Sequence, residues 1–325
     1  MSISIFSHQR PDADAFGTAL ALAVILNAKA WFLRTDWESL PVSIKAIVKK
    51  WPKVKEFVGI FGEQEYTTPT PNPANVVVDC GDPSRISAPE AVKAEGFDIS
   101  YDHHCNQPVA RTEMGRPDAP AAAAVVAQVC SIPNDPVIAT LLFAGLAGDT
   151  AGFSNSASTA EAFEVAATLA RKGADTQLVL DAIHQESAPR ARLKAHAVST
   201  LDQHEVVRKM DDPSMNVLVN CTVLTPEDFE MARAGKADYA GMPGEILAID
   251  GAQVAACLNL DREAGVYRIA FRTTSSSPIR AKELAQAFGG NGHPDAAGGV
   301  VDAPSPIDAQ NKVTKKIVDL IMGDD

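Results

Sequence analysis

The sequence predicts an α/β protein: a parallel sheet with helices on both faces, followed by a smaller α/β domain with a mixed sheet. Over the first half, short apolar strands alternate with alanine-rich helical stretches, which is typical of a parallel sheet. Beyond residue 215, strand-like runs follow one another more directly. Because 325 residues exceed an ordinary single domain, we expect a first domain at 1–185, a linker helix at 186–210 and a second domain at 211–325.

The amino-acid composition indicates which partners and which cellular compartment to expect. The formal charge of −12 disfavours long nucleic acids, because neutralising phosphates requires clustered Lys and Arg. No apolar run is long and uncharged enough for a membrane span, and the N-terminus lacks the pattern of a signal peptide. The five cysteines are scattered, include no CxxC pair and suggest reduced thiols. We therefore expect a cytoplasmic protein with no membrane partner.

The elements of the first half follow from apolar periodicity and from glycine and proline breaks. We expect short strands at 3–6, 31–34, 76–78 and 97–100. We expect helices at 15–28, 41–58 with a break at Pro52, 120–129, 136–146, 160–172, 174–183 and 189–201. Residues 67–73 form a proline-rich connector. Thr159 is a natural cap for the helix that begins at 160.

The second half contains fewer helical patterns. Strand-like runs occupy 216–221, 253–260 and 267–272, and 246–250 is a further candidate strand. Helices are expected at 279–288 and 306–322. Between these helices lies 289–299, two glycine clusters around His293. Such a run is either a backbone nest whose free amides bind an anion or a plain glycine-rich turn.

Acidic and imidazole side chains recur where predicted strands end. Loops that follow parallel strands meet at one edge of a sheet, so these side chains are expected to converge. The candidates are His8, Asp12, Asp14, Asp79, Asp102, His103, His104 and Asp149. Six of the eight have an alternative role: Asp12 or Asp14 as a helix cap, Asp79 as a turn carboxylate, and 102–104 as a polar surface loop.

This collection of carboxylates indicates a metal site. Carboxylates that share a crevice need cations nearby to offset their repulsion. Oxygen ligands with a few imidazoles suit Mn²⁺ or Mg²⁺ better than structural zinc. Two such ions would support in-line attack on phosphorus. Competing hydrolase and nucleotide motifs, the Gly-x-Ser-x-Gly elbow and the P-loop, do not occur in the sequence.

With these residues in place, the chain resembles the DHH phosphoesterase superfamily, in its nanoRNase/pAp-phosphatase branch. The resemblance rests on five ordered motifs that span most of the chain. They are His8 to Gly17, Val78 to Asp82 with Arg85, Asp102-His103-His104, Gly148 to Phe153, and Gly289 to Gly299 preceded by Phe271-Arg272-Thr273. The branch joins a DHH domain to a DHH-associated C-terminal domain, which implies the two-domain fold.

The resemblance implies roles residue by residue. His8 and Asp12 would hold one Mn²⁺, and Asp14, His103 and Asp149 a second, with Asp79 bridging the two. Mg²⁺ or Co²⁺ would be substitutes. Asp102, His103 and His104 would form the catalytic motif, with Asp102 and His104 orienting ligands and polarising the phosphate. Substrate contacts would come from Arg85, Arg272, Gly290, Gly292 and His293.

The implied activity is hydrolysis of short oligoribonucleotides, linear dinucleotides such as pApA, or 3′-phosphoadenosine 5′-phosphate. Alternatives are a cyclic dinucleotide phosphodiesterase, a polyphosphate hydrolase or a non-catalytic nucleotide-binding regulator. The resemblance also implies a homodimer. Two departures bear on the substrate: Asn291 replaces a usual glycine, and the neutral Ser154–Ser156 replaces a basic residue.

Overall fold

The computed structural model describes residues 3–62, 74–104, 107–207 and 216–323. It divides into two compact units, Met1–Gln185 and Glu186–Asp325. Each unit is built on its own sheet, which confirms the α/β class with a parallel first sheet and a mixed second sheet. The connector expected at 67–73 and the thiol of Cys105 lie outside the described residues.

The first sheet has the strand order β3-β2-β1-β4-β6-β7, and every pair along this path is parallel. Its strands are β1 (Ile3–His8), β2 (Lys29–Leu33), β3 (Val58–Phe61), β4 (Ala74–Val78), β6 (Phe97–Tyr101) and β7 (Ala110–Glu113). A two-residue strand, β5 (Ile86–Ser87), pairs antiparallel with the end of β1. The strand order reverses between β1 and β4, and ligands bind at such switch points in open α/β sheets.

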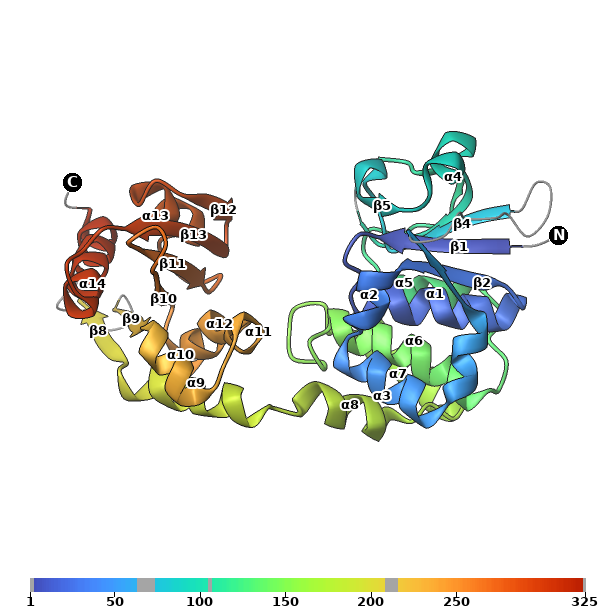
Figure 1. Cartoon of the computed structure of the whole chain (residues 1–325), viewed down its shortest axis with the longest axis horizontal. Helices are drawn as coiled ribbons and strands as arrows, with labels where there is room; N and C mark the ends of the chain where they lie inside the picture. Colours follow the sequence, from blue (N-terminus) through green and yellow to red (C-terminus); the bar gives the residue numbers. More distant parts are fainter. Residues whose placement is uncertain (1–2, 63–73, 105–106, 208–215, 324–325) are drawn as a thin grey trace. The chain divides into compact units, whose positions relative to one another are not determined.

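Helices cover both faces of this sheet. They are α1 (Ala13–Leu26), α2 (Arg34–Glu38), α3 (Val42–Lys50), α4 (Glu90–Glu95), α5 (Ala122–Val129), α6 (Pro136–Asp149), α7 (Ala160–Arg171) and α8 (Thr176–His184). The large core packs Ile5 and Val76 against α1, α3 and α5 to α8. On the opposite face Phe6 and Val77 pack with Val92 of α4 (Figure 1). Adjacent strand residues thus point into different cores, as in a sheet buried on both sides.

Helices α1 and α6 are packed unusually closely. A side chain at Gly17 in α1 would clash with the carbonyl oxygen of Leu141 in α6 and would lie 3.2 Å from the amide nitrogen of Gly145. Glycine is required here by the close approach of two backbones rather than by its own conformational freedom. Because α1 begins beside Asp12 and α6 ends at Asp149, this packing fixes two parts of the candidate site.

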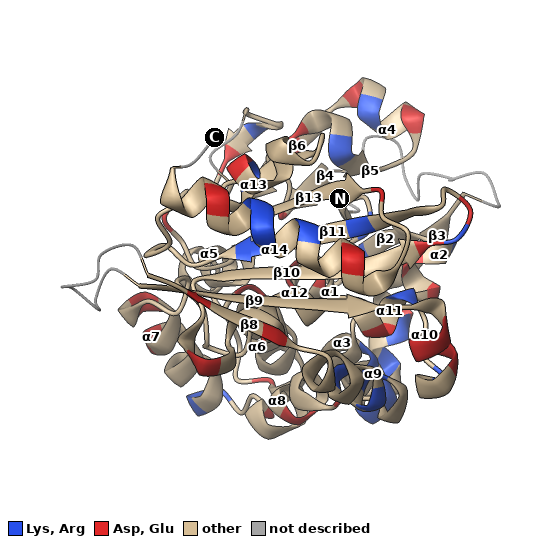
Figure 2. Cartoon of the chain, turned by 90° about the vertical axis from the view of Figure 1, so that its left-hand side faces the viewer, with Lys and Arg blue, Asp and Glu red and all other residues tan. Residues whose placement is uncertain are grey.

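The second sheet has the order β12-β13-β11-β10-β9-β8, in which only β9 and β10 are parallel. Its strands are β8 (Asp202–Val206), β9 (Val217–Leu224), β10 (Val254–Asp261), β11 (Val266–Thr273), β12 (Asn291–His293) and β13 (Ala296–Val301). One face packs against α9 (Ala188–Ser199), α10 (Pro226–Ala232), α11 (Lys236–Tyr239) and α12 (Met242–Leu247). The other packs against α13 (Ala281–Ala287) and α14 (Pro306–Met322). Acidic and basic side chains are interspersed along α14 (Figure 2).

Three expectations about elements need correction. Residues 246–250 are not a strand: they end α12 and begin a 3₁₀ turn at Ile249–Gly251, because Ile246 is anchored in the core beneath the helix. The helical stretch expected at 41–58 with a break at Pro52 consists of α3, which ends at Lys50, and a 3₁₀ helix at Pro52–Phe57; it is one residue shorter than expected, because Val58 begins β3. The expected linker at 186–210 contains β8, which pairs with β9 inside the second unit.

Among the described residues, the helices are all too short or too polar to cross a lipid bilayer.

Candidate metal centre

The structure gathers the predicted acids and imidazoles at one edge of the first sheet. His8 is the last residue of β1, Asp79 directly follows β4, and Asp102 to His104 follow β6. Asp12 and Asp14 lie at the start of α1, and Asp149 is the last residue of α6. This edge is the switch point of the sheet, where the order reverses between β1 and β4.

Asp79 is central to the cluster. Its buried carboxylate places Oδ2 3.5 Å from His8 Nε2 and Oδ1 3.4 Å from His103 Nε2. Although it is not glycine, its φ is 53°, a conformation that costs energy and is typical of functional sites. Oδ1 is buried and makes no hydrogen bond of ordinary geometry with the described residues. An orphaned carboxylate oxygen facing two imidazoles fits a divalent cation.

Both imidazoles near Asp79 are oriented for ligation through Nε2. His8 Nδ1 lies 2.8 Å from the carbonyl oxygen of Gln9, and His103 Nδ1 lies 3.3 Å from that of Ala119. A carbonyl only accepts, so each Nδ1 carries the proton and donates it, which leaves Nε2 for a metal ion. His103 Nε2 also lies 3.0 Å from Asp149 Oδ2.

Three overlapping sets of side chains have ligand atoms within 4.8 Å of one another. Asp79 belongs to two of the sets, and His103 belongs to two. The sets are His8–Asp12–Asp79, Asp14–His103–Asp149 and Asp79–His103–His104. Oxygen-rich sets that share members suit a pair of hard divalent ions.

Asp12 caps a helix as well as facing the cluster. Its Oδ1 accepts hydrogen bonds from the amides of Asp14 and Ala15 at 3.0 and 3.1 Å. The capping alternative raised by the sequence is therefore correct for Asp12. Capping occupies Oδ1, while Asp12 also contributes an oxygen to the set with His8 and Asp79.

Asp14 has a structural role that its position in the sequence does not reveal. Its fully buried carboxylate accepts hydrogen bonds from the amides of Ala122 and Ala123, at 2.6 and 2.9 Å, in the first turn of α5. The Thr18 hydroxyl donates a third at 3.0 Å. The N-cap residue of α5, Ala121, offers no side-chain bond. Asp14 thus caps a second helix while facing His103 and Asp149.

In the metal-free site, the closely spaced charges change the pKa values of the ionisable side chains. Burial opposes protonation of His103, but the carboxylates of Asp149 and Asp79 beside its Nε2 outweigh burial and raise its pKa to about 11. Burial would raise the pKa of Asp79, yet His103 and His8 hold it below its ordinary value. For Asp14, burial and then the charges of Asp79 and Asp149 raise the pKa. The cluster therefore retains protons that a metal ion would displace.

His104 differs from the other imidazoles of the cluster. Its Nδ1 lies 2.7 Å from Oδ1 of the buried Asp102, and its ring is exposed. The Asp102 hydrogen bond raises the pKa of His104 against the opposing effect of burial. Asp102 thus holds His104 with Nε2 free, which is a suitable arrangement for contacting a phosphate oxygen.

Sequence analysis missed one buried acid at the same edge. Asp36, in α2 just after β2, is 8% exposed, and its Oδ2 has no hydrogen-bond partner among the described residues. Burial raises its pKa, and the positive charges of His8 and Arg10 act in the opposite direction. Its placement after a parallel strand, like that of Asp79, was the signal available in the sequence.

The candidate substrate residues of the second unit lie on its sheet. Arg272 in β11 and His293 in β12 both pair with Ala296 of the intervening β13, so they share one row and one face. Arg85 belongs to the first unit, where it is exposed in the 3₁₀ turn Pro83–Arg85.

The glycine run forms a hairpin rather than a nest with free amides. The Gly289 and Gly290 amides bond to carbonyls of α13, and the Gly292 amide bonds to the side chain of Asn291. A side chain at Gly290 would clash with the Gly298 carbonyl, and one at Gly292 would meet Ala297. Of the two alternatives left open by the sequence, these three amides favour the plain glycine-rich turn, because each already donates a hydrogen bond within the second unit.

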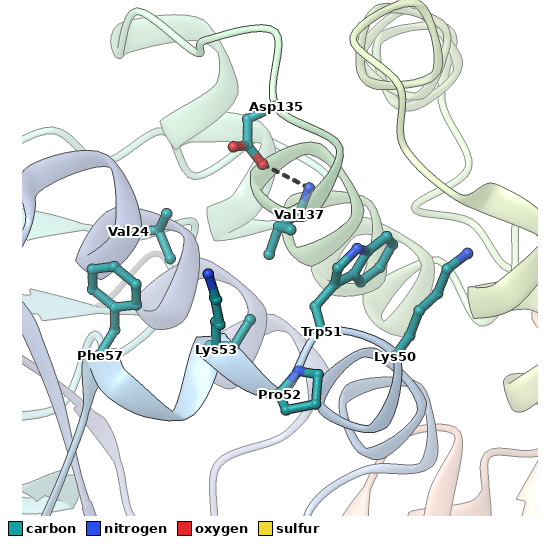
Figure 3. Close-up of a pocket in the computed structure, with 9 residues that line it drawn as sticks. Val24, Lys50, Trp51, Pro52, Lys53, Phe57, Asp135 and Val137 are labelled. Atoms are coloured by element: carbon teal, nitrogen blue, oxygen red, sulfur yellow. Dashed lines mark hydrogen bonds between the residues drawn. The ribbon is translucent and has the colours of Figure 1, made fainter.

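An apolar cavity of about 350 Å³ lies apart from this cluster. It is lined by Trp51, Phe57, Val24 and Val137, with Lys53 beside them and Asp135 capping α6 through the Val137 amide (Figure 3). Val24 lies near the end of α1 and Val137 near the start of α6, whereas the candidate ligands lie at the opposite ends of both helices. The cavity is therefore not part of the metal centre.

Comparison with known proteins gives three results. Residues 2–146 match the DHH family, N-terminal domain. A bifunctional oligoribonuclease and PAP phosphatase, NrnA, from Thermus thermophilus is 29% identical over 304 residues, which cover 91% of this chain and 83% of the relative. An exopolyphosphatase-related protein from Bacteroides fragilis has a similar structure, with a TM-score of 0.68 at 19% identity over 98% of this chain and 93% of its own. The last likeness shows a shared fold.

Proposed function

Because this chain carries a DHH-family domain at residues 2–146, we propose that it is a metal-dependent phosphoesterase that hydrolyses short oligoribonucleotides, linear dinucleotides such as pApA, and 3′-phosphoadenosine 5′-phosphate, pAp. The observation that carries the proposal is the set of three overlapping ligand groups around Asp79 and His103. The name of the Thermus relative, an oligoribonuclease and PAP phosphatase, supports this choice of substrates.

The residues present fit two Mn²⁺ ions, with Mg²⁺ or Co²⁺ as substitutes. His8 and Asp12 would hold one ion, Asp14, His103 and Asp149 the other, and Asp79 would contact both. Bound ions of this kind supply Lewis acidity and lower the pKa of water toward neutrality. Asp79 Oδ1, which lacks a hydrogen-bond partner among the described residues, and the Nε2 atoms of His8 and His103, which face carboxylates of the cluster, would provide the ligand atoms that such ions need.

Other groups of the chain position the reaction. The Ala119 carbonyl fixes the His103 ring, and Asp102 fixes the His104 ring through its Nδ1. With Nδ1 donating to Asp102, His104 in its protonated form would also carry a proton on Nε2, which would stabilise a phosphate oxygen or protonate a leaving oxygen. Holding both rings in place lowers the reorganisation needed during the reaction.

The substrate residues remain part of the proposal. Arg85, Arg272 and His293 would contact phosphate groups, since guanidinium and imidazolium groups form charge-assisted hydrogen bonds with them. Gly290 and Gly292 would act by allowing the tight hairpin that carries His293. Each unit thus offers only a few cations for phosphate groups, which suits a short ligand rather than a long strand.

A substrate panel with added Mn²⁺ tests this function. The panel compares pApA, pAp, cyclic di-AMP and polyphosphate, with Asp79→Asn as the inactive variant and Asp181→Asn, an exposed acid on α8, as the matched control. The proposal is supported if the wild type and Asp181→Asn hydrolyse pApA and pAp and Asp79→Asn does not. Preference for cyclic di-AMP or polyphosphate would assign a different phosphoesterase activity. Nucleotide binding without turnover would indicate a regulator.

Two further properties are proposed with this function. The four described cysteines, Cys80, Cys130, Cys221 and Cys257, are free thiols, as is usual in the reducing cytoplasm, and we place the protein there. We also propose a homodimer. Cell fractionation and sedimentation of the purified chain test these properties.

A further inference from the structure

The first motif, His8 to Gly17, contains a basic residue, Arg10, to which neither the fold nor the candidate metal centre assigns a role. Arg10 lies in the loop between β1 and α1, two residues after His8 and two before Asp12. It is exposed, and among the described residues no hydrogen bond or ion pair engages its guanidinium. The sequence analysis did not single it out, because it belongs to neither the acids nor the imidazoles.

The backbone of Arg10 is strained. Its φ is 56°, in the left-handed region that non-glycine residues adopt at a cost. Proline follows it directly, and the residue before a proline is already restricted. Glycine would satisfy the turn without strain, so a long cationic side chain here is unexplained by the fold alone.

Arg10 carries a charge opposite to that of the ionised carboxylate of Asp36, a buried acid that lies just after β2. Asp36 has an unpartnered Oδ2, and the charge of Arg10 is one of two that offset the effect of burial on this carboxyl. No hydrogen bond joins the two residues.

A second arginine is brought to the same loop. The amide of Gln9 donates to the carbonyl oxygen of Arg85 at 2.8 Å, and His8 pairs with Ile86. The loop of Arg10 and the turn of Arg85 therefore run side by side beside the acidic cluster. The metal ligands are acids and imidazoles, so arginines at this border can hold a phosphate that is not at the metal centre.

We propose that Arg10 binds the non-scissile 5′-phosphate of the substrate, which makes it a specificity residue for short 5′-phosphorylated nucleotides. This inference rests on the proposed function and deepens it. Hydrolysis of pAp breaks the bond between phosphorus and the 3′ oxygen of a 5′-phosphorylated adenosine. Hydrolysis of pApA to two AMP molecules breaks the same bond. A single site for the 5′-phosphate would explain how one metal centre accepts both substrates.

The test compares pApA with ApA, which lacks the 5′-phosphate, on Mn²⁺-loaded protein. The variants are Arg10→Ala, Arg10→Lys and Arg10→Gly, with Arg171→Ala, an exposed arginine at the end of α7, as the control. Loss of a charge-assisted bond predicts a roughly ten-fold rise in KM for pApA with Arg10→Ala, at nearly unchanged kcat. The KM of Arg10→Ala for ApA should stay within about two-fold of the wild-type value. For the control Arg171→Ala, both KM and kcat should stay within the same range.

Two more readouts separate binding from folding. Arg10→Gly should melt at the same or a higher temperature than the wild type, because glycine relieves the positive φ, and yet share the KM defect of Arg10→Ala. Arg10→Lys should bind pApA more tightly than Arg10→Ala but less tightly than the wild type, since lysine keeps the positive charge but lacks the planar guanidinium that can donate two parallel hydrogen bonds. Equilibrium binding of AMP should weaken with Arg10→Ala, whereas binding of adenosine should not.

Three results with Arg10→Ala would overturn the proposal. They are an equal rise in KM for ApA and pApA, no change in KM for either substrate, or an unchanged affinity for AMP. Failure of the wild type to hydrolyse any phosphoester would instead contradict the proposed function. The AMP measurement would still report on Arg10, because it does not depend on turnover.

Discussion

His103 Nε2 lies 3.0 Å from Asp149 Oδ2, although one residue follows a strand and the other ends a helix. The pairing depends on the close packing of α6 against α1, which is possible because Gly17 has no side chain. This candidate ligand set, Asp14–His103–Asp149, is thus assembled by helix packing as much as by the strand edge.

Replacing Asp149 by Asn should remove one anionic ligand and leave the fold intact. Because even outer-shell changes cost roughly 10–100-fold in metal affinity, we expect Mn²⁺ binding to weaken by at least that factor. Titration calorimetry would measure the affinity, and Asp181→Asn provides the control. Unchanged Mn²⁺ affinity would mean that Asp149 is not a ligand.

Asp14→Ala should destabilise the protein even without metal. The change leaves the buried amides of Ala122 and Ala123 without their acceptor, at a cost of roughly 1–3 kcal/mol for each unsatisfied group. Denaturant unfolding in the presence of EDTA would measure this loss. Asp181→Asn, at an exposed position on α8, should show little loss in the same assay. Equal stability of the two metal-free variants would contradict the capping role of Asp14.

Most of the site was predictable because it follows a local rule. His8, Asp79 and the 102–104 motif each come directly after an apolar run, and parallel strands bring their ends to one edge. The bonds from Asp14 to α5 were not predictable, since they join residues distant in sequence. Residues 246–250 were misassigned because a short apolar run does not distinguish a strand from a buried helical turn.

Metal binding should strengthen as the pH rises. Burial lowers the pKa of His103, but the carboxylates of Asp149 and Asp79 outweigh burial and raise this pKa to about 11, so a proton must leave before a metal binds. Calorimetry of Mn²⁺ binding in buffers of different ionisation enthalpy would report proton release. Binding without proton release near neutral pH would contradict this view of His103.

The raised pKa of His103 also predicts that the metal-free protein becomes less stable as the pH rises. A raised folded-state pKa contributes stability below the ordinary value of 6.5, and this contribution is lost as the pH rises through about 11. Unfolding in EDTA should therefore show falling stability across that interval. Adding Mn²⁺ should reverse the trend, because the metal takes the place of the proton.

Gly17→Ala should disturb the metal centre from a distance. The added methyl group would clash with the Leu141 carbonyl, and overpacking of this kind costs roughly 1–3 kcal/mol. We expect lower stability together with weaker Mn²⁺ binding, measured by thermal unfolding with and without the metal. Gly244→Ala in α12, where a side chain meets nothing within 4 Å, is the control and should be neutral or stabilising.

Anomalous diffraction at the manganese edge from crystals grown with Mn²⁺ tests the central claim most directly. The account predicts two peaks at the edge of β1, β4 and β6, one beside His8 and Asp12 and one beside Asp14, His103 and Asp149, both in contact with Asp79. A single peak away from Asp79, or no peak among these residues, would contradict it.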